Sequence, residues 1–88
     1  MSEKYTTITL TLNLSESLLS ILRDAGRPEQ PSRRIRVSPG TPVRQILVDQ
    51  GISPLLVPLI FLDNRKISVD TPLEADAVLT LHGPLAGG

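Results

Sequence analysis

The residues with the clearest chemical potential stand at the C-terminal end, in Gly83-Pro84-Leu85-Ala86-Gly87-Gly88. Gly87 and Gly88 offer a narrow backbone that ends in a free carboxylate and can enter a channel that a Cβ would block. At a glycine frequency of roughly 7%, a closing pair of glycines arises by chance in about 0.5% of chains. The alternatives are an ordinary frayed terminus or a remnant of cloning. The pair therefore favours a terminus that a partner reaches, with Leu85 and Ala86 gripped along with it.

Side-chain chemistry elsewhere in the chain is sparse. The sequence has no cysteine, which excludes disulfides, thiolate zinc sites and thiol catalysis. His82 is the only histidine and has no paired carboxylate nearby in sequence, so it suggests neither a metal site nor a triad. Asp63 and Asp70 stand at turn-like positions, where Asp is expected for backbone reasons. Neither a dinucleotide fingerprint nor a Walker sequence occurs, so we expect no bound cofactor and no metal.

Size and composition point to one small domain. The chain has 88 residues, and its nine Lys and Arg balance nine Asp and Glu, which argues against a nucleic-acid or membrane-surface partner. Its apolar runs are far shorter than the roughly 20 residues that span a bilayer, and the N-terminus lacks the plan of a signal peptide. We therefore expect a cytoplasmic protein. With one Phe, one Tyr and no Trp, its core must be aliphatic.

The first half of the chain predicts two strands and two helices. Residues 6–14 alternate apolar and polar side chains, which is typical of a half-buried strand. Ser15 caps a short helix that Gly26 ends. Residues 33–38 alternate again and predict a second, antiparallel strand with Ile35 and Val37 inward. Thr41 is then expected to cap the helix that Gly51 closes, with Pro42 at its first position.

The second half predicts three short strands. Pro54 and Pro58 deny residues 53–62 a helix and favour extended structure, with a strand at 59–62. Residues 63–65 form a turn, and a strand follows at 66–69. Residues 70–73 are expected to form a tight helical turn and 74–76 a bend. The last strand covers 77–82, and Gly83 with Pro84 ends it.

This order of elements describes an α+β fold of the β-grasp, ubiquitin-like kind. We expect a mixed sheet of about five strands packed on one main helix. The β-grasp domain covers residues 1–82, and residues 83–88 form a flexible C-terminal Gly-Gly tail. No repeat or internal linker interrupts the domain.

The chain resembles the ubiquitin-like sulfur carriers of the MoaD and ThiS families, and the likeness spans nearly its whole length. Five features in order carry it, and together they are more specific than any one alone. They are Pro39-Gly40-Thr41-Pro42-Val43; Leu47 with Gly51-Ile52; Phe61-Leu62-Asp63-Asn64-Arg65; Asp70-Thr71-Pro72-Leu73; and Pro84-Leu85-Ala86-Gly87-Gly88.

The resemblance implies a reaction at the terminus. In these families an ATP-dependent, ubiquitin-activating-type enzyme adenylates the terminal carboxylate, and sulfur replaces the adenylate to give a thiocarboxylate. By resemblance Gly88 is the modified residue, and Gly87, Ala86 and Leu85 lie within the segment that partners bind. The chain would be a carrier and co-substrate rather than an enzyme, or the small subunit of a synthase. It would bind no ATP itself and would hand sulfur to a sulfur-accepting synthase.

Several functions remain open at this point. The ending Pro84-Leu85-Ala86-Gly87-Gly88 favours a MoaD-like role in molybdopterin biosynthesis. A ThiS-like role in the thiamine thiazole, or sulfur delivery to another metabolite, also fits. A rival of another class is a ubiquitin-like modifier attached to target lysines through Gly88. Another is a non-catalytic β-grasp interaction module whose tail is incidental.

Two further groups of side chains are candidates for partner contact. Residues 55–61 are richer in apolar side chains than one small core face needs. Core burial is the first explanation; the alternative is an exposed patch, in which Leu59 and Phe61 are the expected partner contacts. Arg33, Arg34 and Arg36 predict either a site for an acidic or phosphate-bearing partner or, more commonly, a solvated strand face.

Overall fold

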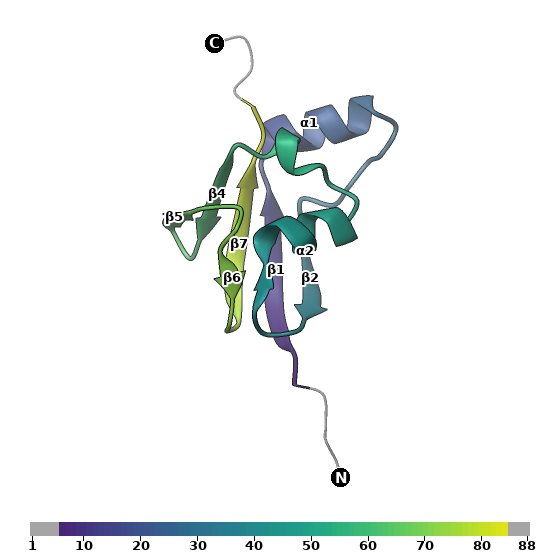
Figure 1. The fold of residues 1–88 in the computed structure, drawn as a ribbon. Helices are drawn as coiled ribbons and strands as arrows, with labels where there is room; N and C mark the ends of the chain where they lie inside the picture. Colours follow the sequence, from purple (N-terminus) through teal and green to yellow (C-terminus); the bar gives the residue numbers. More distant parts are fainter. Residues whose placement is uncertain (1–5, 85–88) are drawn as a thin grey trace.

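The computed structural model describes residues 6–84, and the chain folds around a five-stranded sheet (Figure 1). A separate pair of short strands, two α-helices and one 3-10 helix complete the structure of this part of the chain. The elements in chain order are β1 (Ile8–Leu14), α1 (Glu16–Asp24), β2 (Ser32–Val37), β3 (Thr41–Pro42), α2 (Val43–Asp49), the 3-10 helix η1 (Pro54–Leu56), β4 (Leu59–Leu62), β5 (Arg65–Ile67), β6 (Pro72–Leu73) and β7 (Ala77–His82).

The sheet has the strand order β2-β1-β7-β4-β5 and is mixed. β1 pairs antiparallel with β2 and parallel with β7, while β4 runs antiparallel to both β7 and β5. In Figure 1 α2 lies in front of the sheet, and α1 lies across its upper end, above β1 and β7. The buried side chains of both helices join the same core cluster as those of β1 and β7, and we call the two helices the helical layer. The predicted β-grasp fold is confirmed. Its helical layer holds two comparable helices, α1 of nine residues and α2 of seven.

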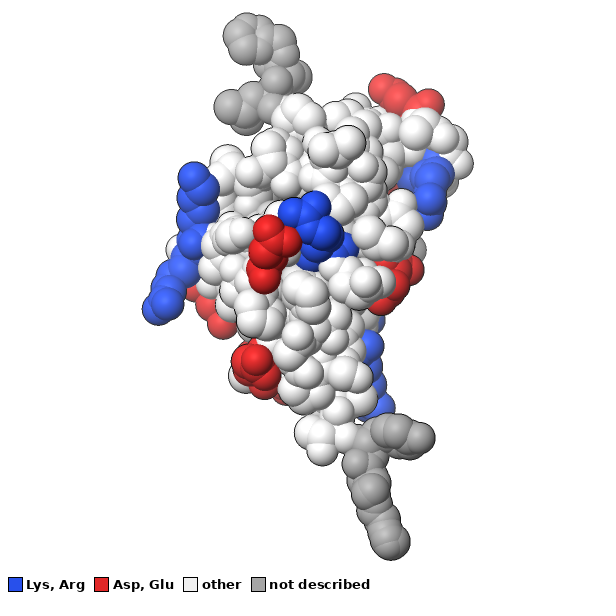
Figure 2. Space-filling view, viewed as in Figure 1, with Lys and Arg blue, Asp and Glu red and all other residues white. Residues whose placement is uncertain are grey.

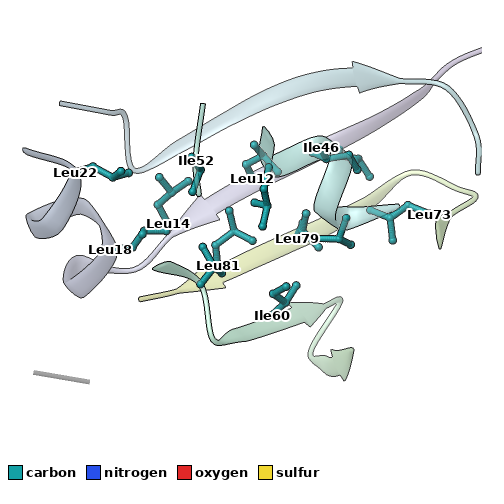
Figure 3. Packing of buried hydrophobic residues seen from close by; sticks show 14 of the residues in the cluster. Leu12, Leu14, Leu18, Leu22, Ile46, Ile52, Ile60, Leu73, Leu79 and Leu81 are labelled. Atoms are coloured by element: carbon teal, nitrogen blue, oxygen red, sulfur yellow. The ribbon is translucent and has the colours of Figure 1, made fainter. Parts of the chain in front are cut away.

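Among the described residues, the core between the sheet and the helices is built from aliphatic side chains, as the composition predicted. Strict alternation in β1 buries every second side chain, from Ile8 to Leu14, against the helical layer. Figure 3 shows Leu12 and Leu79 from the central strands directed toward Ile46 of α2. The buried set is Ile8, Leu10, Leu12, Leu14, Leu18, Leu19, Leu22, Val43, Ile46, Leu47, Ile52, Val57, Ile60, Leu73, Leu79 and Leu81.

Within residues 6–84 no helix covers the second face of the sheet, and we call it the open face. Arg34 lies opposite Thr11 in the ladder, and Arg36 lies opposite Thr9, so these side chains share this face. The prediction that Ile35 and Val37 point inward while Arg34 and Arg36 point outward is confirmed, because the inward pair packs against the core. The open face is therefore more polar at β1 and β2 than the core face beneath the helices.

The start of α2 differs from the prediction. Thr41 does not cap this helix; its hydroxyl donates to the carbonyl of Ser38 at 2.7 Å, and its backbone pairs with Leu73 in the β3–β6 ladder. The N-cap is Pro42, which makes no side-chain cap bond. Pro42 therefore precedes the helix instead of occupying its first turn.

Three local predictions after α2 also need correction. Residues 54–56 form the 3-10 helix η1 instead of extended chain, because Pro54 fits the first position of a helical turn and the Ser53 hydroxyl accepts the Leu55 N–H at 3.3 Å. The strand predicted at 66–69 begins one residue earlier, at Arg65, and ends at Ile67. Residues 72–73 form strand β6 and not a helical turn, since they pair with β3.

Candidate functional site

The C-terminal residues singled out from the sequence lie outside the described part of the chain. These are Gly88, the expected site of modification, and Gly87, Ala86 and Leu85, the expected partner contacts. Gly83 and Pro84 are described, and they define where this segment leaves the domain. Gly83 follows directly after β7, a central strand of the sheet, and we call Gly83 and Pro84 the tail root.

The tail root is held by the first turn of α1. The N–H of Gly83 donates to the hydroxyl oxygen of Ser15 at 3.2 Å, and the same oxygen accepts the N–H of Leu18 at 3.3 Å. The Ser15 N–H in turn donates to the carbonyl of Leu81 at 3.0 Å. Ser15 therefore caps α1, as predicted, and also fastens the end of β7 to that helix.

Close packing reinforces this attachment. Gly83 is buried, whereas Pro84 is exposed. A Cβ added to Gly83 would come within 2.9 Å of both the backbone nitrogen and the Cα of Leu18, closer than such atoms approach in proteins. Only glycine lets the chain pass this close to α1. Ordered contact with the domain therefore reaches Gly83, one residue beyond β7.

An apolar patch lies on the open face beside the tail root. Leu59 is opposite His82 in the β4–β7 ladder, and Phe61 is opposite Thr80. The rings of Phe61 and His82 meet edge to face, with centroids 5.5 Å apart and an interplanar angle of 78°. Ile60, between Leu59 and Phe61, is buried in the core, whereas Leu59 and Phe61 are only partly covered. We call Leu59, Phe61 and His82 the open-face patch.

The other apolar residues of this region divide between core and surface. Val57 is buried, and Leu56 packs against the core from η1. Leu55 is 91% exposed, so the sequence was right to indicate more apolar side chains here than the core uses. No sequence signal distinguished Leu55 from Val57, because a 3-10 turn has neither the strand nor the α-helix period.

Within residues 6–84, His, Cys, Asp and Glu side chains nowhere gather in a group of three or more that could hold a metal ion. Neither helix of this part of the chain is long and apolar enough to cross a membrane. Lys and Arg are interspersed with Asp and Glu on the face seen in Figure 2, so this face carries no large region of one sign.

The clearest electrostatic effect lies away from the tail root, between α2 and the turn before β6. The guanidinium of Arg44 donates from Nε to Asp70 Oδ1 at 2.9 Å and from Nη2 to Oδ2 at 3.3 Å. This hydrogen bonding holds the pKa of Asp70 below its ordinary value and raises the pKa of Arg44. Asp70 is therefore a side-chain partner of Arg44. The expected backbone role is seen at Asp63, whose Oδ1 accepts the Val78 N–H at 2.9 Å.

The three arginines of β2 do not act as one group. Arg33 forms an ion pair with Glu29 at 2.6 Å on the core side of the strand, while Arg34 and Arg36 lie exposed on the open face. The sequence therefore placed Arg34 and Arg36 correctly but could not separate Arg33, whose partner lies in the preceding loop.

Comparison of folds places this chain among small β-grasp proteins. It matches the solution structure of the Haloferax volcanii HVO 2177 protein with a TM-score of 0.68 and 17% identity, covering all of this chain and 93% of that one. It matches the crystal structure of SAMP1 from Haloferax volcanii with a TM-score of 0.62 and 18% identity, over 91% and 99% of the two chains.

A third similar structure comes from Pyrococcus furiosus, from a protein provisionally assigned as molybdopterin converting factor subunit 1. The TM-score is 0.60 and the identity 14%, over 89% of this chain and 99% of that one. At these identities the likeness is one of fold. No family model and no curated protein matches the sequence.

Proposed function

We propose that this protein is a sulfur carrier whose Gly88 carboxylate is converted to a thiocarboxylate by a partner enzyme. The observation that carries the proposal is the tail root: Ser15 and close packing fix Gly83 against α1, so the chain beyond Pro84 starts from a defined point beside the open-face patch. A closing Gly87-Gly88 pair on such a root suits insertion into a narrow active site. The β-grasp fold shared with the Pyrococcus furiosus protein adds support.

The chemistry requires two steps at the terminus. A carboxylate oxygen of Gly88 attacks the α-phosphorus of ATP, and pyrophosphate leaves, which gives an acyl adenylate. A sulfide-level donor then attacks the acyl carbon, and AMP leaves with the electron pair of the broken C–O bond. The terminus ends with sulfur in place of one oxygen. The carrier contributes no catalytic side chain, so ATP and sulfur are both handled by the adenylating enzyme.

Affinity for partners comes from the tail together with the open-face patch. Leu59 and Phe61 are partly exposed, and the His82 ring braces Phe61 beside the tail root. A partner that covers this patch is placed to receive the segment after Pro84. Aromatic anchors of this kind commonly dominate small interfaces. The same patch serves first the adenylating enzyme and then the sulfur-accepting synthase.

Among acceptors, we favour a molybdopterin synthase, in which this chain is the small subunit. The ending Pro84-Leu85-Ala86-Gly87-Gly88 and the fold shared with the converting-factor subunit of Pyrococcus furiosus support this choice. The competing functions are a ThiS-like carrier, a carrier for another metabolite and a covalent protein modifier. A further alternative is a β-grasp interaction module whose terminus undergoes no reaction.

The intact mass of the protein purified from its native host separates these functions. A sulfur carrier should contain a fraction heavier by the difference between sulfur and oxygen, located in the C-terminal peptide. Covalent conjugates to lysines of other proteins would favour the modifier. A terminus that stays unmodified in the presence of the adenylating enzyme, ATP and a sulfide donor would exclude both.

Two matched variants test the roles of the terminus and of the patch. Removal of Gly88 should leave the fold intact and abolish sulfur uptake; uptake by this truncated chain would show that the site is wrong. Phe61→Ala should raise the KM for the carrier in the adenylation assay about tenfold, a typical loss for an interface anchor. The control is Val48→Ser on α2, an exposed apolar position in the helical layer that should leave KM unchanged.

A further inference from the structure

β2 forms one border of the sheet and differs from the border at the other side. It is six residues long and contains no proline, whereas β5 at the opposite border has three residues and adjoins the Asp63-Asn64 turn. Proteins usually shorten or interrupt an edge strand to prevent pairing with other chains. β5 follows that pattern, and β2 retains the length and regularity of a strand able to accept a partner.

The register shows which backbone groups of β2 face outward. The Leu14 N–H donates to the Pro31 carbonyl at 2.8 Å, so this pair is of the hydrogen-bonded kind. In an antiparallel ladder such pairs alternate with pairs whose N–H and C=O groups point away from each other. Counting along the ladder makes the outward-facing positions of β2 Ser32, Arg34 and Arg36.

Two of these three positions, Arg34 and Arg36, carry positive charge. Among residues 6–84, no ion pair within 4.0 Å involves Arg34 or Arg36, whereas Arg33 on the other side of the strand is paired with Glu29. A hollow of about 270 Å³ lies at this border, lined by Thr9, Arg34, Ile35 and Arg36. In Figure 2 blue atoms run along the margin of the molecule over β2. A single ligand at this edge could therefore contact both the free backbone N–H and C=O groups of β2 and the side chains of Arg34 and Arg36.

From this coincidence we propose that β2 is a docking edge for an extended acidic segment of a partner protein, which adds to the sheet as a further strand. Asp or Glu at alternate positions of that segment pairs with Arg34 and Arg36 on the open face. Apolar side chains at the intervening positions lie beside Ile35 and Val37, which are half-buried at the border of the core. A second copy of β2 does not fit, because arginines would face arginines.

This docking edge is separate from the tail root and independent of the proposed sulfur chemistry. β1 lies between β2 and β7, and Arg36 lies opposite Thr9 near the start of β1, whereas the tail root follows the end of β7. Since β1 and β7 are parallel, with Leu14 beside Leu81, Arg36 and the tail root are at opposite ends of the sheet, and β1 separates the rest of β2 from β7. A partner on β2 therefore leaves the open-face patch and the tail accessible.

The test uses the full chain and a short blocked peptide that alternates Glu with Val and is as long as β2. Titration followed by amide NMR should shift the signals of Ser32, Arg34 and Arg36 and slow their hydrogen exchange, with no change at β5. The double variant R34E/R36E should weaken binding about tenfold or more, since two exposed ion pairs become repulsive. A peptide with Lys in place of Glu should bind this variant better than it binds the natural chain.

The matched control is R65E/K66E, which reverses two exposed charges on the opposite edge strand and should leave peptide affinity unchanged. The proposal fails if the Glu peptide binds R34E/R36E as well as the natural chain, or if it shifts amides outside β2. It also fails if a proline-interrupted peptide of the same charge, or inorganic phosphate, competes equally, because the site would then be a simple anion site. If the Glu peptide does not bind at all, the proposal is wrong, and Arg34 and Arg36 only protect the edge strand from pairing with other chains.

Discussion

The two helices of this fold begin in different ways. α1 begins with a side-chain cap: the Ser15 hydroxyl accepts the Leu18 N–H, and it also holds Gly83 at the end of β7. α2 begins at Val43, and its N-cap residue, Pro42, makes no side-chain cap bond. The Ser15 hydroxyl therefore links α1 to the tail root. The first N–H groups of α2 must find their hydrogen-bond acceptors elsewhere in the fold.

The backbone supplies these acceptors for α2. The N–H groups of Val43 and Arg44 donate to the carbonyls of Thr71 and Val69, at 3.0 and 2.8 Å. These carbonyls belong to the segment leading into β6, whose pairing with β3 brings them to the helix. A first turn capped in this way depends on the whole fold, whereas the cap of α1 is local and additionally anchors the route to the C-terminus. The comparison predicts different sensitivities to mutation at the two ends.

Gly83→Ala should give the largest effect, because its Cβ would meet the backbone of Leu18 and α1 would have to move. Overpacking of this kind costs about 1–3 kcal/mol, and backbone atoms yield less than side-chain ends. Urea unfolding measures the loss. Pro84→Ala, at the exposed next residue, is the control and should stay within about 0.5 kcal/mol. Equal stability of the Gly83→Ala variant would contradict the close packing of the tail root against α1.

Ser15→Ala should come next, with a loss of about 1 kcal/mol for the helix cap. Because the same hydroxyl accepts from Gly83, hydrogen exchange at the Gly83 amide should also become faster in this variant. Ser15→Asp keeps an acceptor at the N-cap and should restore most of the stability. If exchange at Gly83 does not change while α1 is destabilised, Ser15 acts only on its own helix and the link to the tail root is absent.

Thr41→Ala should cost less than Ser15→Ala, within about 0.5 kcal/mol, because the first turn of α2 is satisfied by backbone carbonyls. The lost contact is one exposed hydrogen bond from the Thr41 hydroxyl to the Ser38 carbonyl. Unfolding of both variants under the same conditions gives the comparison directly. A loss as large as that of Ser15→Ala would mean that the two helix starts do not differ as described.

The same contrast explains what the sequence could and could not predict. Strand β1 and the cap at Ser15 were predictable because alternation and capping depend only on residues that are close in sequence. Thr41-Pro42 looks like a helix start by the same rules, and the prediction was wrong because β6, distant in sequence, takes these residues into a strand pair. No local sequence pattern predicts a two-residue strand such as Pro72–Leu73.

The candidate site likewise contains features that the sequence predicted and features that it did not. The apolar richness of residues 55–61 pointed to Leu59 and Phe61 as candidates, and the ladder with β7 adds that they share a face with His82 beside the tail root. The second role of Ser15 was invisible, because it needs Gly83 to arrive next to α1. A glycine directly after the last strand was the available signal, and close backbone approach is one of the few reasons for glycine there.

The smallest effect is expected at Asp70, whose ion pair with Arg44 braces the segment that caps α2. Its pKa is lowered in the folded protein by the hydrogen bond from Arg44, so the pair adds stability above the ordinary Asp pKa and loses it as pH falls through the folded value. Asp70→Asn should therefore lower the melting temperature slightly at neutral pH, and the difference should shrink in acid. The pair is exposed, so the effect should also decrease as the salt concentration rises.

Arg44→Gln is the matched control and should lower the melting temperature as much as Asp70→Asn does. The double variant should lose no more stability than either single variant. If the difference in melting temperature persists below the folded pKa of Asp70, the effect comes from something other than this ion pair.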